Sequence, residues 1–200
     1  MKHLFADNKL VVATHNPGKV REIGALLEPY GLSCVSSLEL DLPEPIEDGD
    51  TFAANALIKA RSAASESGLT ALADDSGLAV NALGGDPGIY SARWAGPNKD
   101  FSVAMKKVED ALSGKEDMSA SFHCVLALVT ADGQEFVFDG QCAGHLEFPK
   151  RGTQGFGYDP IFVAEGMDKT FAEIDADTKY FVSHRTQAFQ LFEDQILSKL

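Results

Sequence analysis

Two adjacent carboxylates, Asp74 and Asp75, follow a short apolar run and precede Ser76-Gly77. Side chains at the end of a strand in α/β proteins usually face a ligand, so this pair is a candidate metal site. The alternative is a simple turn in which aspartate bonds to nearby backbone. Mg²⁺ is typically held by one or two carboxylates together with phosphates and water. Further candidate oxygen ligands lie on an acidic, proline-containing loop over residues 41–50: Glu44, Glu47 and Asp48.

A glycine and a lysine, Gly18 and Lys19, stand where a β-branched run over 9–14 gives way to apolar residues at helical spacing. Backbone N–H groups at the positive end of a helix, together with an ammonium group, suit phosphate. A lysine in the first helical turn opposes the helix dipole unless an anion is near, although a solvated lysine is the alternative. The segment is not a Walker A motif, because Ala13 and Val20 occupy its glycine and Ser/Thr positions.

A second lysine, Lys59, lies four residues after Asn55 in an alanine-rich segment over 51–67 that ends at Gly68. We expect this segment to be a helix, so the two side chains share one face. The small alanines allow another group to approach this face closely. A plain surface pair is the alternative interpretation.

Two clusters near the C-terminus have side chains suited to a nucleoside. Phe156-Gly157-Tyr158-Asp159 places aromatic rings on a glycine-rich loop, where they either stack on a base or fill the core. Ser183, as N-cap, opens the last helix and is followed by His184 and Arg185. With Lys179 a few residues earlier, these donors are candidates to recognise a base edge or a phosphate.

The elements that must position these residues alternate between strands and helices, which predicts an α/β fold with a mixed sheet. A hairpin is expected around Asp132-Gly133, since Asp-Gly joins two β-like runs. The strands are expected over 9–14 and 32–36, from 70 to an end within 74–77, and over 122–130, 135–139 and 161–163. The helices are expected after the Gly18-Lys19 loop up to Gly31, over 51–67 and 99–112, and from the N-cap Ser183 onward.

Composition narrows the function classes. The chain has 200 residues, 44% of them hydrophobic, which suffices for one large domain or two closely joined lobes. A net charge of -13 argues against a surface that binds nucleic-acid backbones. The three cysteines are far apart, so neither a disulfide framework nor a zinc site is expected. No apolar run approaches the length of a membrane span, and we expect no membrane partner and a cytoplasmic location.

Taken together, the motifs resemble the inosine triphosphate pyrophosphatase family, also described as non-canonical purine NTP pyrophosphatases or XTP/dITP diphosphatases. The chain contains, in that family's order and spacing, ATHNPGKVREI, TFAANALIKARSAA, LADDSGLAVNALGGDPGIYSARWAG, FHCVLAL, GFGYDPIF and SHR. The resemblance covers about residues 10–188. It departs at His15, where the family often has glycine, and at Thr186, where glycine commonly follows His-Arg.

The resemblance implies an elongated mixed β-sheet flanked by helices, with two lobes, an active-site cleft between them, and a single ITPase-like domain over 1–200. It also implies a homodimer and Mg²⁺-dependent hydrolysis of ITP, dITP or XTP to a nucleoside monophosphate and pyrophosphate. The catalytic carboxylate would be Asp75, which would bind Mg²⁺ together with Glu47, assisted by Asp74. The substrate-binding residues implied by the motifs are Thr14, His15, Asn16, Pro17, Gly18, Lys19, Lys59, Ser76, Phe156, Gly157, Tyr158, Asp159, Lys179, His184 and Arg185.

Three other functions remain open from the sequence. A broader nucleotide pyrophosphatase would act on modified pyrimidine or canonical triphosphates. A P-loop kinase or ATPase is disfavoured by the incomplete Gly-Lys context. A nucleotide-sensing module would keep the pocket without turnover, but it would not need the Asp74-Asp75 pair.

Overall fold

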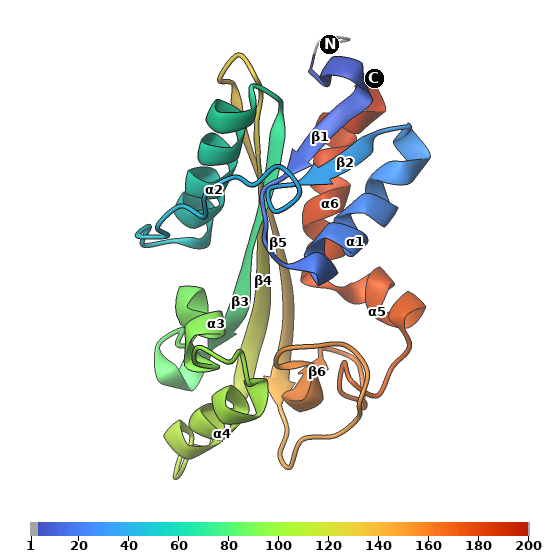
Figure 1. The fold of residues 1–200 in the computed structure, drawn as a ribbon. Coiled ribbons are helices and arrows are strands. Elements are labelled where there is room, and N and C mark those ends of the chain that lie inside the picture. Colours follow the sequence, from blue (N-terminus) through green and yellow to red (C-terminus); the bar gives the residue numbers. More distant parts are fainter. Residues whose placement is uncertain (1–3, 200) are drawn as a thin grey trace. The chain divides into compact units, whose positions relative to one another are not determined.

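The computed structural model describes residues 4–199, apart from the side chain of Pro17. Six strands form one sheet in the order β2-β1-β3-β4-β5-β6 (Figure 1). The strands are β1 (Lys9–Val12), β2 (Ser33–Ser36), β3 (Ala71–Val80), β4 (Ser119–Val129), β5 (Glu135–Leu146) and β6 (Phe162–Ala164). β1 runs parallel to β2 and to β3, whereas β5 and β6 are antiparallel. The expected α/β class with a mixed sheet is confirmed.

Most of the six α-helices within residues 4–199 begin at a residue whose side chain caps the helix N-terminus. Asn16, Thr51, Asp100 and Asp175 each accept a hydrogen bond from a backbone N–H of the first turn. Such caps satisfy donors that the helix itself leaves unpaired. The helices are α1 (Pro17–Leu27), α2 (Phe52–Ser67), α3 (Ser91–Trp94), α4 (Phe101–Ala111), α5 (Ala176–Val182) and α6 (His184–Gln195).

The chain divides into two compact units, and neither is one continuous segment. The first unit comprises residues 1–75, 125–139 and 188–200, and the second comprises 76–124 and 140–187. The chain passes from the first to the second unit within β3, between Asp75 and Ser76. The expectation of a single domain over 1–200 stays a prediction.

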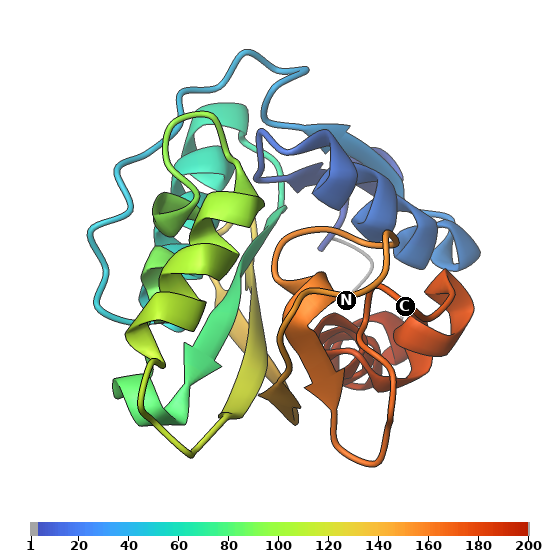
Figure 2. The ribbon, with the colours of Figure 1, turned by 90° about the horizontal axis from the view of Figure 1, so that it is seen from below.

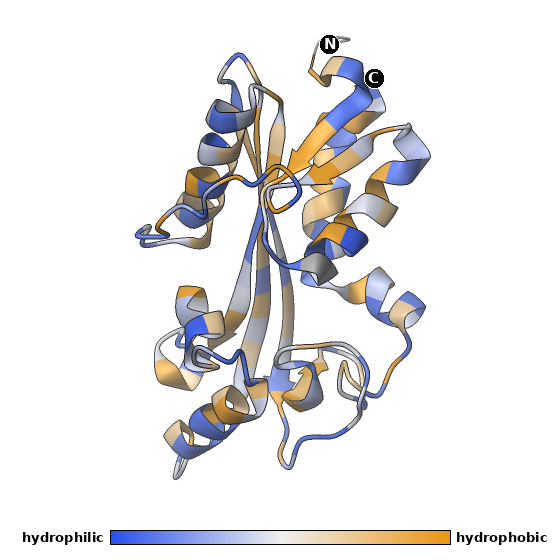
Figure 3. Cartoon of the chain, viewed as in Figure 1, coloured by the Kyte–Doolittle hydropathy of each residue, from blue (hydrophilic) through white to orange (hydrophobic). Residues whose placement is uncertain are grey.

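In the first unit, α2 lies on one face of the sheet, and α1 and α6 lie on the other (Figures 1 and 2). Alternate residues of a strand face opposite sides, so Val11 and Ala71 pack with the α2 alanines. Buried α2 positions are all small apart from Asn55, which lets the helix lie close to the strands. Apolar and polar residues alternate around the helices (Figure 3), as expected for helices with one buried side.

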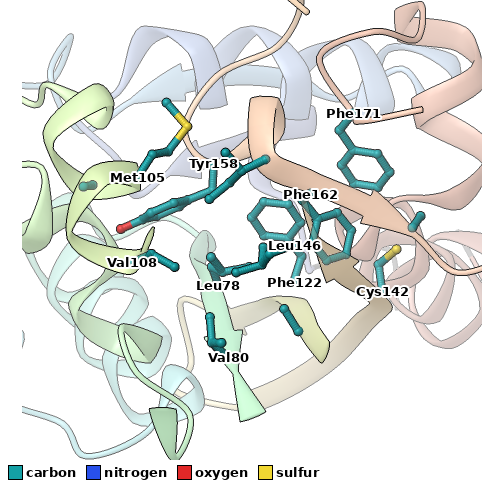
Figure 4. Packing of buried hydrophobic residues seen from close by; sticks show 14 of the residues in the cluster. Leu78, Val80, Met105, Val108, Phe122, Cys142, Leu146, Tyr158, Phe162 and Phe171 are labelled. Carbon is teal, nitrogen blue, oxygen red and sulfur yellow. The ribbon is translucent and has the colours of Figure 1, made fainter. Parts of the chain in front are cut away.

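In the second unit, the core gathers around aromatic rings from β4, β6 and the loops beside them. Phe122 lies against Phe162 and Phe171, with ring centroids 4.5 and 5.9 Å away. Leu78 and Val80 of β3 belong to the same cluster (Figure 4). The glycine-rich loop before β6 runs beside that strand (Figure 2) and is tied down through Thr153, whose N–H donates to the carbonyl of Ala172.

Several expected elements differ from the structure. The prediction that the strand beginning at residue 70 ends within residues 74–77 is wrong, because β3 continues through them to Val80. The hairpin around Asp132-Gly133 is confirmed, with the N–H of Gly133 donating to the carbonyl of Thr130. Ser183 caps α6 as predicted, since its Oγ accepts from the N–H of Thr186.

The sequence did not predict α3 or α5. The signal for α5 was Asp175, whose carboxylate accepts from the N–H of Thr178 three residues later. Within residues 4–199, no helix has the length and apolar character needed to cross a membrane.

Candidate functional site

Asp75 lies on β3 in the first unit with 12% of its side chain exposed. Its Oδ1 accepts a hydrogen bond from Nζ of Lys59 at 2.8 Å. Its Oδ2 is buried and has no hydrogen-bond partner among the described residues. Burial raises the pKa of Asp75, and the positive charge of Lys59 offsets this rise only in part. One oxygen of this carboxylate is thus left for a ligand.

Lys59 connects Asp75 to the acidic loop. Its Nζ lies 3.4 Å from Oε2 of Glu47. Burial by itself would lower the pKa of Lys59, but the charges of Asp75 and Glu47 outweigh it, so the pKa is raised. Of the three acidic candidates on the loop, Glu47 is the one that the described structure brings to this cluster.

Lys19, in the first turn of α1, forms an ion pair with the carboxylate of Asp74. The Asp74 side chain is fully buried, and its backbone carbonyl lies 3.4 Å from the same ammonium group. The anion that offsets the unfavourable position of Lys19 is therefore a carboxylate of the protein itself. The interpretation of Lys19 as a plain solvated lysine is wrong.

The loop before α1 is ordered by its own side chains. The Oδ1 of Asn16 accepts from the N–H of Gly18 at 2.9 Å, and the Oγ1 of Thr14 accepts from the N–H of Asn16 at 3.1 Å. Pro17 is the first helical residue, a position where its missing N–H costs nothing. The loop and Lys19 thus come together at the start of α1.

The two departures from the family pattern each have a structural role. His15 lies 3.1 Å, measured from Nε2, from the carbonyl oxygen of Leu42, so it ties the loop before α1 to the start of the acidic loop. Thr186 shares a hydrogen bond of 3.0 Å with the hydroxyl of Ser183 at the start of α6.

In the second unit, two cations flank the half-exposed ring of Phe156. Nζ of Lys179 lies 5.1 Å from the ring centroid, and Cζ of Arg185 lies 5.9 Å from it. Cations over an aromatic face are attracted by its negative potential. An exposed ring beside two hydrogen-bond donors is an arrangement that can stack on a planar base and bind its edge.

Asp159 holds this arrangement together. Its Oδ2 accepts from the N–H of Phe156 at 2.8 Å and pairs with Lys179 at 2.5 Å. A side chain at Gly155 would collide with this carboxylate, since an added Cβ would lie 2.0 Å from Oδ2. The family motifs place Asp159 among the substrate-binding residues. In the structure its carboxylate contacts Phe156 and Lys179 and holds both in place.

Tyr158 and His184 are buried. The hydroxyl of Tyr158 donates to the carbonyl of Ser91 at 2.9 Å, and its ring lies beside Met105 and Val108 (Figure 4). Of the two interpretations of this aromatic loop, Tyr158 fits core filling and Phe156 fits stacking. The ring of His184 stacks on Phe122 at 4.8 Å.

The remaining candidates of the second unit, Ser76 and Gly157, lie near these groups. Nη2 of Arg185 is 3.5 Å from Oγ of Ser76, at the outer limit of a hydrogen bond. Gly157 has a positive φ of 68°, which favours glycine, and leaves ordinary space toward Phe101.

Asp75 and Glu47 are the described residues that could hold Mg²⁺. Among residues 4–199, no group of three or more His, Cys, Asp or Glu side chains is arranged to bind a metal. The unpartnered Oδ2 of Asp75 nevertheless fits a hard cation, with Glu47 nearby. Such a site suits Mg²⁺, which often takes only one or two carboxylates and completes its shell with phosphate oxygens and water.

The sequence of this chain matches a known protein family. The Ham1 family model matches residues 10–195. A dITP/XTP pyrophosphatase of Caulobacter vibrioides is 56% identical over 183 residues, covering 90% of this chain and 94% of that protein. One of Zymomonas mobilis is 54% identical over 185 residues, covering 91% and 88%.

Solved structures agree with this result. A HAM1 protein from Coxiella burnetii matches with a TM-score of 0.89 and 39% identity, over 96% of this chain and 99% of that one. The Staphylococcus aureus Ham1 protein matches with a TM-score of 0.88 and 36% identity, over 96% and 100%. Since family pattern, sequence identity and fold all extend over nearly the whole chain, this protein belongs to the Ham1 family.

Proposed function

We propose that this protein hydrolyses non-canonical purine nucleoside triphosphates (dITP, XTP and ITP) to the nucleoside monophosphate and pyrophosphate, with Mg²⁺ as cofactor. The observation that carries the proposal is the buried Asp75 carboxylate, which has one oxygen paired with Lys59 and the other without a partner. The names of the relatives, dITP/XTP pyrophosphatases, support the substrate class.

The first unit would handle the triphosphate. Lys19 and Lys59 supply positive charge, and the loop of Thr14, His15, Asn16, Pro17 and Gly18 would line the phosphates at the positive end of α1. Mg²⁺, held by Asp75 and Glu47, would neutralise developing charge and make its bound water more acidic. A water attacks the α-phosphorus in line, and Asp75 accepts its proton while pyrophosphate leaves. The raised pKa of Asp75 makes it a better base than an ordinary aspartate.

The second unit would select the base. Phe156 would stack on the purine, and Lys179, His184 and Arg185 would offer donors to its edge. Inosine and xanthosine present a 6-oxo acceptor, whereas adenine presents an amino donor. A site built around such a polar contact can reject the wrong partner by about 10⁴–10⁵. Ser76, Gly157, Tyr158 and Asp159 would shape and orient this pocket.

The test is to incubate the purified protein and Mg²⁺ separately with ITP, XTP, dITP, ATP and GTP, resolving phosphate from pyrophosphate. Pyrophosphate from ITP, XTP and dITP, with little from ATP or GTP, is the expected result. Orthophosphate release would indicate an ATPase, and equal use of all bases would indicate a broad pyrophosphatase. Binding without turnover would indicate a nucleotide sensor.

We also propose that the functional form is a cytoplasmic homodimer that binds neither nucleic acid nor membrane. Its net charge of -13 supports the absence of a nucleic-acid surface. Sedimentation of the purified protein across a concentration series tests the dimer, and a monomer at every concentration would refute it.

A further inference from the structure

We propose that Asn55 is a positioning residue that fixes the acidic loop over 41–50, so that Glu47 reaches Lys59 and the Asp75 carboxylate. The inference rests on the proposed function for its catalytic consequence, but its structural part can be tested without any substrate. Asn55 would act through the loop and would not touch the nucleotide.

The contact between Asn55 and the loop is buried and directional. Asn55 is 1% exposed, although it lies on α2 among alanines. Its Oδ1 accepts a hydrogen bond from the N–H of Gly49 at 2.9 Å. A buried amide in a helix face of alanines costs free energy unless its polar atoms are bonded, so its presence requires this kind of partner.

The loop needs such an anchor because it has no regular structure of its own. Residues 42–50 form neither helix nor strand, and most of them are exposed or half-buried. Ile46 is 83% exposed, so its side chain does not hold the loop against a core. Leu42 packs against the core at the start of the loop, whereas the contacts beside Glu47 are polar.

Asn55 and Lys59 hold the loop at two points. They lie four residues apart, one turn along α2, and therefore share a face. Asn55 binds the backbone at Gly49, and Lys59 binds the carboxylate of Glu47 at 3.4 Å. Lys59 also binds Asp75, so the helix sets the distance between the loop carboxylate and the strand carboxylate.

Gly49 fits this contact from the opposite side. A Cβ at this position would lie 2.7 Å from Oδ1 of Asn55 and 2.7 Å from Cβ of Ala54. Any larger residue would push the loop away from α2. Gly49→Ala therefore breaks the same contact as Asn55→Ala but leaves the α2 sequence unchanged. An effect seen in both variants cannot be explained by a folding defect of α2.

The first experiment measures amide hydrogen exchange of the loop in the free protein. The backbone amide of residue 49 should exchange roughly tenfold faster in Asn55→Ala and in Gly49→Ala, the change expected when about one hydrogen bond of ordering is lost. Gly24→Ala is the matched control, because a Cβ at Gly24 in α1 meets open space. Unchanged protection at residue 49 in Asn55→Ala would overturn the proposal.

The second experiment is a double-mutant cycle with Glu47→Gln, using kcat/KM for dITP. Asn55→Ala should lower kcat/KM roughly tenfold in the native background and by less than about twofold in the Glu47→Gln background, since both changes remove the same group from the site. Equal losses in both backgrounds would show that Asn55 does not act through Glu47. If the native protein turns over no nucleotide, the proposed function fails while the exchange result still decides the structural part.

Discussion

Asp75 experiences two opposing effects. Burial disfavours its charge and raises its pKa, while the ammonium group of Lys59 favours the charge and lowers the pKa. Burial has the larger effect. The result is a carboxylate that is more basic than usual and has one oxygen without a hydrogen-bond partner among the described residues, which suits a metal ligand or a proton acceptor.

Asp75→Asn should abolish most turnover, because the amide neither accepts the proton nor binds Mg²⁺ strongly. We expect kcat to fall by at least about 10²–10³-fold, as when a main electrostatic group is removed from an active site. Single-turnover assays with dITP, alongside fluorescence titration of a non-hydrolysable analogue, separate chemistry from binding. Near-native kcat would refute the role of Asp75.

The pH dependence follows from the raised pKa. Activity requires the ionised carboxylate, so kcat/KM should fall as pH drops through the pKa of Asp75, at a higher pH than for an ordinary aspartate. Lys59→Gln removes the charge that lowers this pKa, so the acidic limb should move to higher pH.

Arg61→Gln is the control for that profile. Arg61 is on the same helix but pairs with Glu135 at 2.7 Å on the surface, so its loss should leave the acidic limb in place. If the acidic limb of the pH profile does not move in Lys59→Gln, the group whose titration controls activity is not Asp75.

At the residue level, the sequence indicated which side chains could do chemistry but not how they pair. Lys59 and Asp75 are 16 residues apart and meet only because α2 packs beside β3. From the sequence, Lys59 was paired with Asn55 instead, because the two residues are four positions apart on one helix. The partnership of Lys19 with Asp74 spans 55 residues and was equally invisible to a local pattern.

At the scale of elements, α2 combines two faces. Its alanines pack on the strands, and Asn55 with Lys59 faces the acidic loop. The alanines were expected to let another group approach α2 closely, and in the structure that group is the β-sheet. The boundaries of α2 were predictable because Thr51 and Gly68 are strong start and stop residues.

Ala60→Leu tests this close packing. Ala60 is fully buried between α2 and the sheet, and extra methyl groups there should force the helix outward. We expect a loss of about 1–3 kcal/mol in the free energy of unfolding, measured by urea denaturation. Ser65→Leu, on the exposed side of α2, adds the same side chain and should change stability by less than about 0.5 kcal/mol. Equal losses would contradict the packing argument.

β3 shows why part of the fold was not predictable. Asp74-Asp75-Ser76-Gly77 has the composition of a turn, yet it continues the strand to Val80. Strand preference depends on neighbours more than on the residue itself, and β3 has β1 on one side and β4 on the other. Ion pairs with Lys19 and Lys59 compensate for the two buried carboxylates.

At the scale of the whole molecule, the chain builds its units from separated segments. Residues 188–200 belong to the first unit, although the segment before them in the sequence, 140–187, belongs to the second. Ala188, Phe189 and Phe192 of α6 are buried, and Phe192 packs against Phe138 with ring centroids 5.3 Å apart. The last helix therefore holds together segments that are far apart in the sequence.

Phe192→Ala should destabilise the protein by about 3–5 kcal/mol, because it removes a fully buried ring and leaves a cavity. Leu191→Ala is the matched control, since its neighbouring side chain is 39% exposed and should matter much less. Thermal and urea denaturation measure the difference. A similar loss in both variants would show that α6 is not anchored through Phe192.

The hydrogen bond from Gly49 to Asn55 also affects how the protein ages. An Asp-Gly pair is prone to isoaspartate formation, in which the glycine nitrogen attacks the preceding carboxyl group and closes a succinimide ring. In Asp48-Gly49 that nitrogen is held by Asn55, and the glycine backbone packs against α2. We therefore expect the bond that is proposed to position Glu47 also to slow succinimide formation in the loop that carries it.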